Sequence, residues 1–148
     1  MPTLRVLLCL LPGLLCGQGR PDGAELYRQY CAACHGGEGR GIPNAFPPLA
    51  GADFLVQHRE KALRAPLEGL KERIEVNGAA YQGWMPPVIL DDAQLTAVFN
   101  HIFTSFGNSL PTVTVEEIAA LRTRTKYPTH AQLRAALSPD TLPAAPVG

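Results

Sequence analysis

The sequence predicts an all-α domain with one small β-hairpin and a helical extension at its C-terminal side. Apolar residues recur at helical spacing in residues 22–30 and again in residues 91–106. An Asn-Gly pair lies in the middle of the alternating segment 74–81, a pattern typical of a tight hairpin. Thr114 and the two glutamates after it have the sequence of a capping box, which predicts a further helix beyond the main body. The 148 residues suffice for one domain and a tail.

Residues 31–35 read Cys-Ala-Ala-Cys-His, and this C-x-x-C-H pattern is the attachment signal of a c-type heme. Cys31 and Cys34 would add to the two vinyl groups of one porphyrin. Because the two thiols lie most of one helical turn apart, both sulfurs face the same way. The imidazole of His35 can then take the proximal axial position on the iron.

Two other uses of a C-x-x-C pair fit the sequence less well. A thioredoxin-like redox pair expects a βαβ setting, whereas the residues before Cys31 have a helical pattern. A zinc site expects four Cys or His ligands, commonly in two closely spaced pairs. The other thiols, Cys9 and Cys16, lie in a segment that we expect to be removed. The pattern therefore favours heme.

Composition narrows the possible partners. Lysine and arginine number 13, and aspartate and glutamate also number 13, which argues against nucleic acid and against an anionic membrane surface. Aromatic residues make up 7% of the chain, so a buried porphyrin would supply apolar bulk that the side chains lack. We expect a monomer whose partners are other proteins.

The N-terminus has the features of an export signal over residues 1–19. Arg5 precedes a short apolar run, and small residues at Gly17 and Gly19 suit cleavage before Arg20. The run is shorter than the roughly 20 apolar residues of a transmembrane helix. An uncleaved membrane anchor is the alternative, while Leu15 argues against lipid attachment at Cys16. Export agrees with the heme hypothesis, because c-type heme is attached outside the cytoplasm as a rule.

The first helix and the segments that follow His35 surround the predicted site. Asp22 is placed to cap the helix, and Gly23 leaves room for another helix to cross closely. We expect Tyr27 and Tyr30 to pack in the core. The glycine-rich segment 36–41 predicts a loop and lacks the lysine and the preceding strand of a phosphate-binding loop.

A loop and then a helical segment are predicted for the next two stretches of the chain. Residues 42–51 form a proline-stiffened apolar loop, and a carbonyl of this loop could accept the Nδ1–H of His35. Residues 53–69 have a helical pattern, in which we expect Pro66 to break or restart the helix.

Met85 is the second candidate for heme chemistry. Apart from the initiator it is the sole methionine of the chain, and Pro86 and Pro87 stiffen the backbone after it. A thioether in the sixth position of heme iron raises the reduction potential relative to a second histidine. A core methionine that fills a gap is the alternative, although no helical apolar pattern surrounds Met85. The rival ligands are His58, His101 and His130, of which the first and last lie among polar residues.

The C-terminal part begins with the clearest helix of the chain, which Asp91 and Gln94 cap and Gly107-Asn108 ends. We expect the heme-binding domain to span residues 20–109. Residues 110–137 would form two short helices packed on this domain, since they are too short to be stable alone. Residues 138–148 are rich in proline and alanine and are predicted to be disordered.

The order of these features resembles that of class I cytochromes c over about residues 22–121. The most specific stretches are residues 30–35, 39–51, 74–85 and 95–107. The chain is similar to bacterial members with a C-terminal extension, among them thermophile carriers that donate electrons to a heme-copper terminal oxidase. The resemblance implies the class I cytochrome c fold around one heme.

The resemblance also implies roles for single residues. Cys31 and Cys34 would hold the heme covalently, and His35 and Met85 would be its axial ligands. The carbonyl of Pro47 would orient the His35 ring. The first helix would meet the helix of residues 91–106 near His101, and the extension would wrap the body like a clasp.

The chain departs from the family pattern at three positions and in its charge. His101 replaces the usual aromatic residue, Trp84 is bulkier than the usual residue beside the ligand, and Pro66 interrupts a segment that is often helical. Sparse charge puts docking by electrostatic steering in doubt. An apolar patch of Ala32, Trp84, Pro86 and Pro87 is the expected docking surface.

These features predict an electron carrier of the periplasm rather than an enzyme. Single electrons would pass through one low-spin heme c with His/Met ligation. The donor would be a quinol-oxidising complex or a dehydrogenase, and the acceptor a terminal oxidase or reductase. The alternative is a dedicated cytochrome c subunit of an oxidoreductase complex, such as a nitrite reductase or a dehydrogenase. A peroxidase-like heme enzyme fits less well, because it needs an open iron site and usually a second heme motif.

Overall fold

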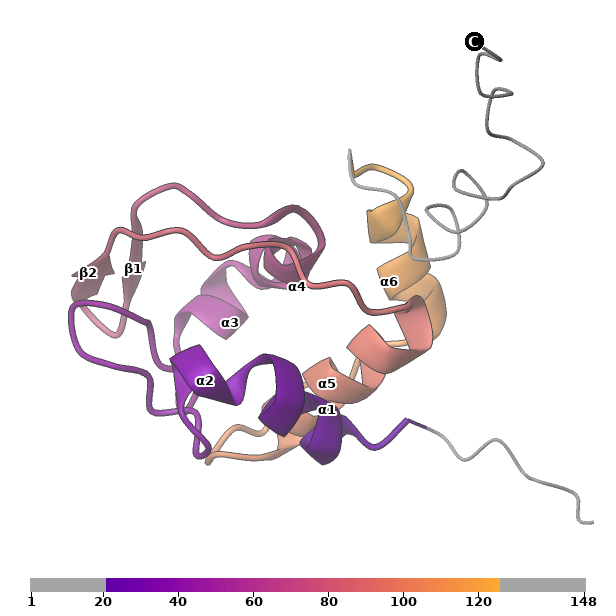
Figure 1. Cartoon of the computed structure of the whole chain (residues 1–148), viewed down its shortest axis with the longest axis horizontal. Coiled ribbons are helices and arrows are strands. Elements are labelled where there is room, and N and C mark those ends of the chain that lie inside the picture. The colour runs from indigo at the N-terminus through magenta and orange to yellow at the C-terminus, as the bar shows by residue number, and fades with distance from the viewer. Residues whose placement is uncertain (1–20, 126–148) are drawn as a thin grey trace, which may run out of the picture.

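The computed structural model of the protein describes residues 21–125 (Figure 1). The described part is mostly helical with one two-stranded antiparallel sheet, as the sequence predicts. Its elements are, in order, α1 (Gly23–Tyr30), α2 (Ala32–His35), α3 (Phe54–Gln57), α4 (Arg59–Glu68), β1 (Ile74–Val76), β2 (Ala79–Tyr81), α5 (Asp92–Thr104) and α6 (Val115–Arg122). The predicted signal, second extension helix, disordered tail and His130 all lie outside the described residues.

Helices α1 and α5 cross at close range. Asp22 caps α1 by accepting hydrogen bonds from the backbone N–H groups of Ala24 and Glu25, at 2.9 and 3.3 Å. A Cβ atom added to Gly23 would lie 2.1 Å from the carbonyl oxygen of Ala97 on α5. Only glycine therefore allows this crossing, which the sequence predicts, and the crossing fixes where α1 and the cysteine pair begin.

The expected helix break at Pro66 is wrong, because α4 runs through this residue. The chain instead breaks at His58, between α3 and α4, where φ is −129° and ψ is 42°. Pro66 lacks an N–H group and lies in the last turn of α4, so the helix loses one hydrogen bond shortly before it ends. The carbonyl of Pro66 accepts a hydrogen bond from the backbone N–H of Val88 at 2.8 Å.

The hairpin forms around the predicted Asn77-Gly78 turn. Both residues have positive φ angles, 52° and 76°, which match the mirror-image turn that suits twisted antiparallel strands. Ile74 pairs with Tyr81 at the open end of the hairpin, and both side chains are buried. The backbone N–H of Asn77 donates to the Asp53 carboxylate at 2.8 Å, and the Asp53 N–H donates to Asn77 Oδ1 at 3.0 Å. These two bonds tie the turn to the start of α3.

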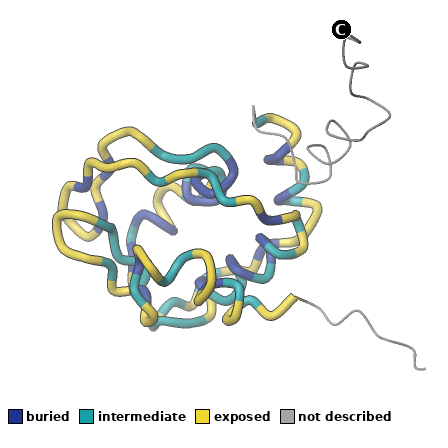
Figure 2. The backbone as a smooth tube through the Cα atoms, viewed as in Figure 1, coloured by how far each residue is buried: buried dark blue, intermediate teal, exposed yellow. Residues whose placement is uncertain are grey.

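The C-terminal helices cover the side of the molecule away from the hairpin (Figure 1). Asp91 and Gln94 form the predicted capping box at the start of α5. Helix α6 packs on α4 and α5, and the Arg59 guanidinium donates to the carbonyls of Pro111 and Thr112 on the connection, at 3.0 and 3.4 Å. Figure 2 shows buried residues on helices throughout the described chain. The largest fully buried side chains are those of Tyr27, Leu63, Val76, Leu95, Phe103 and Ile118. No helix within residues 21–125 is long and apolar enough to cross a membrane.

Candidate functional site

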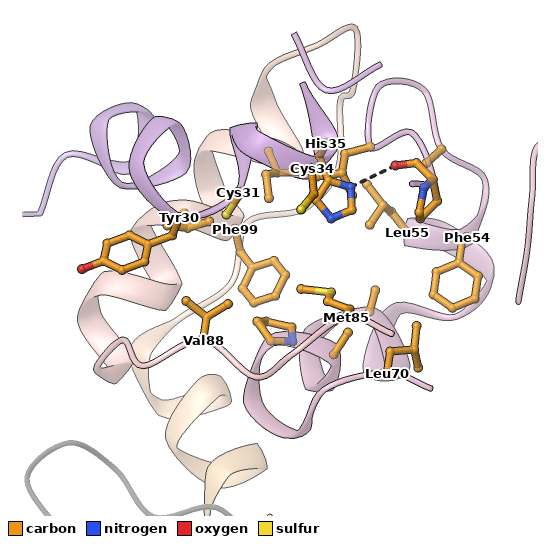
Figure 3. Close-up of a pocket in the computed structure, with 18 of the residues that line it drawn as sticks. Tyr30, Cys31, Cys34, His35, Phe54, Leu55, Leu70, Met85, Val88 and Phe99 are labelled. Atoms are coloured by element: carbon orange, nitrogen blue, oxygen red, sulfur yellow. Dashed lines mark hydrogen bonds between the residues drawn. The ribbon is translucent and has the colours of Figure 1, made fainter. Parts of the chain in front are cut away.

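A cavity lies between α2, the loop of residues 42–51, α4, the hairpin and α5 (Figure 3). Its empty volume is about 1050 Å³ when the open mouth is included. Among the described residues that line it none is charged, and apart from the His35 imidazole and the Tyr30 hydroxyl their side chains are aliphatic, aromatic or sulfur-containing. Such a cavity suits a large apolar group that is coordinated by very few polar atoms.

His35 ends α2, and its ring points into the cavity (Figure 3). The side chain is buried, and Nδ1 lies 2.9 Å from the carbonyl oxygen of Pro47. Because a carbonyl only accepts, Nδ1 carries the proton and Nε2 keeps a free electron pair. Burial lowers the pKa of His35, which the hydrogen bond to Pro47 partly opposes, so the neutral ring is favoured. The result is an imidazole ready to bind a metal ion.

Glycine lets the Pro47 loop approach His35. Gly41 has φ of 65°, and a Cβ atom there would lie 2.3 Å from the Phe46 carbonyl oxygen and 2.7 Å from that of Pro47. Its backbone N–H also donates to the His35 carbonyl at 2.7 Å. Cys31, helix α2 and this loop, over residues 31–51, together form what we call the histidine side of the cavity.

Cys31 and Cys34 lie on the same side of the cavity as His35, and both line it (Figure 3). Cys31 is half-buried and Cys34 is exposed. Burial, followed by the proximity of Cys34, raises the pKa of the Cys31 thiol to about 11. The preceding element is α1, not a strand, which argues against a thioredoxin-like setting. Within residues 21–125 no cluster of three or more Cys, His, Asp or Glu could hold a metal ion by itself.

Met85 faces His35 from the other side of the cavity (Figure 3). It belongs to residues 82–90, which we call the methionine strap and which cross the cavity without helix and almost without strand pairing. Leu70 and Met85 exchange two backbone hydrogen bonds, at 2.8 and 2.9 Å. Together with the bond from the Val88 N–H to the Pro66 carbonyl, these contacts hold the strap against the end of α4.

The rival histidines of the described chain lie away from the cavity, which neither His58 nor His101 lines. His58 is exposed and packs on Phe54, with ring centroids 4.9 Å apart. His101 packs between the rings of Tyr27 and Phe106, at 5.5 and 5.2 Å.

The two tyrosines of α1 differ in their exposure to solvent. Tyr27 packs in the core as predicted, but the same expectation for Tyr30 is wrong, since its side chain is 43% exposed. Tyr30 is the last residue of α1 and lies at the edge of the cavity, where its side chain stays partly open to solvent (Figure 3).

Three supporting contacts were missed by reasoning from the sequence. The Tyr27 hydroxyl donates to the Gly36 carbonyl at 2.7 Å, which ties α1 to the end of α2. Leu70 pairs with Met85, and the buried Arg122 of α6 donates to the Leu90 carbonyl at 2.8 Å. The spacing of Gly23 and Tyr27 is a signal for the first contact, because it places the tyrosine at the helix crossing. No local pattern signals the other two.

The residues present fit an iron porphyrin. The lining of the cavity is free of charge and is almost wholly apolar, as a porphyrin requires, and it offers thiol, imidazole and thioether groups. Cys31 and Cys34 could hold the porphyrin edge, while His35 and Met85 approach from the two faces.

Comparison with known proteins agrees with this fit. The family model described as cytochrome c matches residues 21–105. A cytochrome c-552 of Thermus thermophilus is 42% identical over 136 residues, which cover 85% of this chain and 89% of the relative. The cytochrome c subunit of the quinone alcohol dehydrogenase of Gluconacetobacter polyoxogenes is 33% identical over 68% of this chain, but this match covers 22% of the subunit. The fructose dehydrogenase cytochrome subunit of Gluconobacter japonicus is 27% identical over 68% of this chain and 22% of the subunit. The chain therefore belongs to the cytochrome c family of electron carriers with one covalently bound heme c, and its Cys31 and Cys34 fit the attachment motif.

Proposed function

We propose that this protein is an exported carrier of single electrons whose low-spin heme c has His35 and Met85 as axial ligands. The observation that supports the proposal is the position of these two side chains on opposite sides of a charge-free cavity (Figure 3). The heme supplies the one-electron chemistry. The protein supplies position, exclusion of water and tuning of the iron.

Each side of the cavity has its own part in this tuning. On the histidine side, the hydrogen bond from Nδ1 to Pro47 fixes the ring tautomer and makes Nε2 a stronger donor to the iron. On the other side, the Met85 thioether favours the ferrous state and raises the reduction potential relative to bis-histidine ligation. The apolar lining disfavours added charge at the iron, which acts in the same direction.

Optical spectra of the mature protein test the ligand assignment. We expect low-spin c-type bands and, in the oxidised protein, a sulfur-to-iron charge-transfer band that Met85→Ala removes. His58→Ala is the matched control and should leave this band unchanged, because His58 lies outside the cavity. Carbon monoxide binding to the reduced wild-type protein at neutral pH would contradict Met85 ligation and favour a peroxidase-like enzyme.

The mouth of the cavity is the proposed docking surface for redox partners. Residues 41–52 and the methionine strap carry no charged side chain, and they border the same cavity. Trp84 on the strap is 61% exposed, with Lys71 as its cationic neighbour at 5.6 Å from the ring. A partner with an uncharged apolar surface around its own cofactor would fit this face, together with Ala32, Pro86 and Pro87.

We propose a terminal oxidase or reductase as the acceptor, and a quinol-oxidising complex or a dehydrogenase as the donor. The similarity to cytochrome c-552 over most of both chains favours a separate carrier. The matches to cytochrome subunits of two dehydrogenases favour the second candidate, a dedicated subunit of an oxidoreductase complex. Affinity purification from the native membrane and periplasm distinguishes them. A free shuttle elutes alone, whereas a subunit elutes with a catalytic chain in fixed ratio.

Export is proposed from residues 1–19, which lie outside the described part of the structure. Cleavage before Arg20 would leave a periplasmic protein that starts just ahead of the Asp22 cap. Mass spectrometry of the mature protein tests this. A chain that still contains residues 1–19 and sediments with membranes would instead identify an uncleaved anchor.

A further inference from the structure

The methionine strap depends on contacts with distant parts of the chain. It crosses the cavity between β2 and α5, and its backbone bonds reach Pro66 and Leu70 at the end of α4. These bonds restrain its first part, up to Val88. Beyond Val88 the chain must still turn into α5, so the position of Met85 also depends on what holds this second end.

Arg122 occupies the second end of the strap. Its side chain projects from the last turn of α6 and is only 9% exposed. Nη2 donates to the carbonyl of Leu90 at 2.8 Å, and Nε donates to Asp92 Oδ1 at 2.5 Å. The planar guanidinium thus bonds at once to the last residue of the strap and to the first residue of α5.

We infer that Arg122 is a positioning residue for Met85, through which the C-terminal extension keeps the methionine strap closed over the heme. The inference rests on the proposed ligation by Met85. It adds α6 to the elements that support this ligand, although α6 has no side chain in the cavity lining. Arg122 touches neither cavity nor ligand, so its effect passes through the backbone of residues 88–92.

Burial makes this contact strong. A buried guanidinium must satisfy its donors within the protein, and a charge-assisted hydrogen bond to a carbonyl is stronger than a neutral one. Helix α6 is itself held from the other side, because Arg59 lies 3.6 Å from Glu117 and bonds to the connection before α6. The extension is therefore anchored on α4, the same helix that restrains the first end of the strap.

Displacement of Met85 by added imidazole in the oxidised holoprotein tests the inference. Imidazole reaches the iron only when the strap opens, so its affinity reports the stability of the closed strap. We expect Arg122→Met to raise this affinity by about tenfold, the size of one lost charge-assisted hydrogen bond. Asp92→Asn should have a smaller effect, since the bond to Leu90 remains.

Arg124→Met is the matched control, because Arg124 follows α6, is largely exposed and has its guanidinium 3.8 Å from the Glu60 carboxylate. It should leave the imidazole affinity unchanged. If Arg122→Met does not fold, Arg122→Lys replaces it in the test. Lysine keeps the positive charge but lacks the planar guanidinium that bonds to two acceptors at once. The inference would be overturned if both Arg122 variants bound imidazole with the wild-type affinity. A lower resistance of these variants to urea would not change that conclusion. If the wild-type protein lacks the sulfur-to-iron band, the ligand assignment itself fails, which is a separate result.

Discussion

The two sides of the heme cavity are built in opposite ways. On the histidine side, the two cysteines, the imidazole and the Pro47 carbonyl all lie within residues 31–47. On the other side, the methionine strap has little secondary structure, and its backbone hydrogen bonds are made with Pro66, Leu70 and Arg122.

This difference implies that heme attachment and the tuning of the iron depend on different parts of the chain. The groups proposed to attach heme depend on local geometry on the histidine side, whereas Met85, the proposed sixth ligand, lies in a strap held by contacts with α4 and α6. We therefore expect the heme to stay attached when the methionine side opens. Substitutions on the histidine side should affect the presence of heme, and those on the strap its coordination and access.

The largest expected effect is the loss of covalent heme. In Cys31→Ala/Cys34→Ala neither thioether can form, and we expect no heme to stay with the chain in denaturing electrophoresis followed by heme staining. Met85→Ala should stain like the wild type, because it changes only the sixth position. Equal loss of stain in both variants would show that the two sides are not separable in this way.

The next effect concerns the helix crossing that supports the histidine side. Gly23→Ala places a methyl group against the Ala97 carbonyl oxygen, where an added Cβ atom would lie 2.1 Å away. We expect the free energy of unfolding of the holoprotein, measured in urea by circular dichroism, to fall by about 2 kcal/mol.

Gly37→Ala is the control for this crossing, because a Cβ atom there meets nothing within 4 Å. Its unfolding free energy should stay within about 0.5 kcal/mol of the wild type. Equal stability of the two alanine variants would mean that α1 can shift on α5 without cost.

A smaller effect is expected from the link between α1 and α2. Tyr27→Phe removes the hydroxyl that donates to the Gly36 carbonyl at 2.7 Å. The loss should lower the unfolding free energy by about 1 kcal/mol, since the acceptor is left without this partner. Tyr30→Phe should change it little, because that side chain is 43% exposed. If both variants unfold alike, the hydroxyl of Tyr27 does not stabilise the histidine side.

The smallest expected effect is that of salt on electron exchange at the mouth of the cavity. Exchange between oxidised and reduced wild-type protein, followed by NMR line broadening, should change less than about twofold from low to physiological salt. Gln82→Lys adds a positive charge to the exposed strap, so exchange should slow at low salt and recover as salt screens the repulsion. Gln57→Lys, exposed on α3 among charged neighbours, should behave like the wild type. A steep salt dependence of the wild type would contradict docking at an uncharged face.

Much of the structure follows from short sequence patterns because the contacts concerned are local. The Asp22 and Asp91 caps, the Asn77-Gly78 turn and the close crossing at Gly23 each depend on residue types whose backbone or side-chain chemistry allows little choice. Pro66 shows the limit of this reasoning. Proline inside a helical pattern predicts a helix break. Near a helix end, however, proline costs only one hydrogen bond, and the burial of several α4 side chains outweighs this cost.

By itself, the sequence determined the cofactor of this protein and predicted the residues that attach it, because the attachment signal of a c-type heme is contained in five consecutive residues. It also determined the main helices and the hairpin. Only the tertiary structure decided that Met85 faces His35, that Tyr30 turns outward, and that Arg122 reaches the end of the strap. These features join residues far apart in the chain. The free energy that stabilises them comes from burial and from hydrogen bonds that exist only once α4, α5 and α6 have packed together.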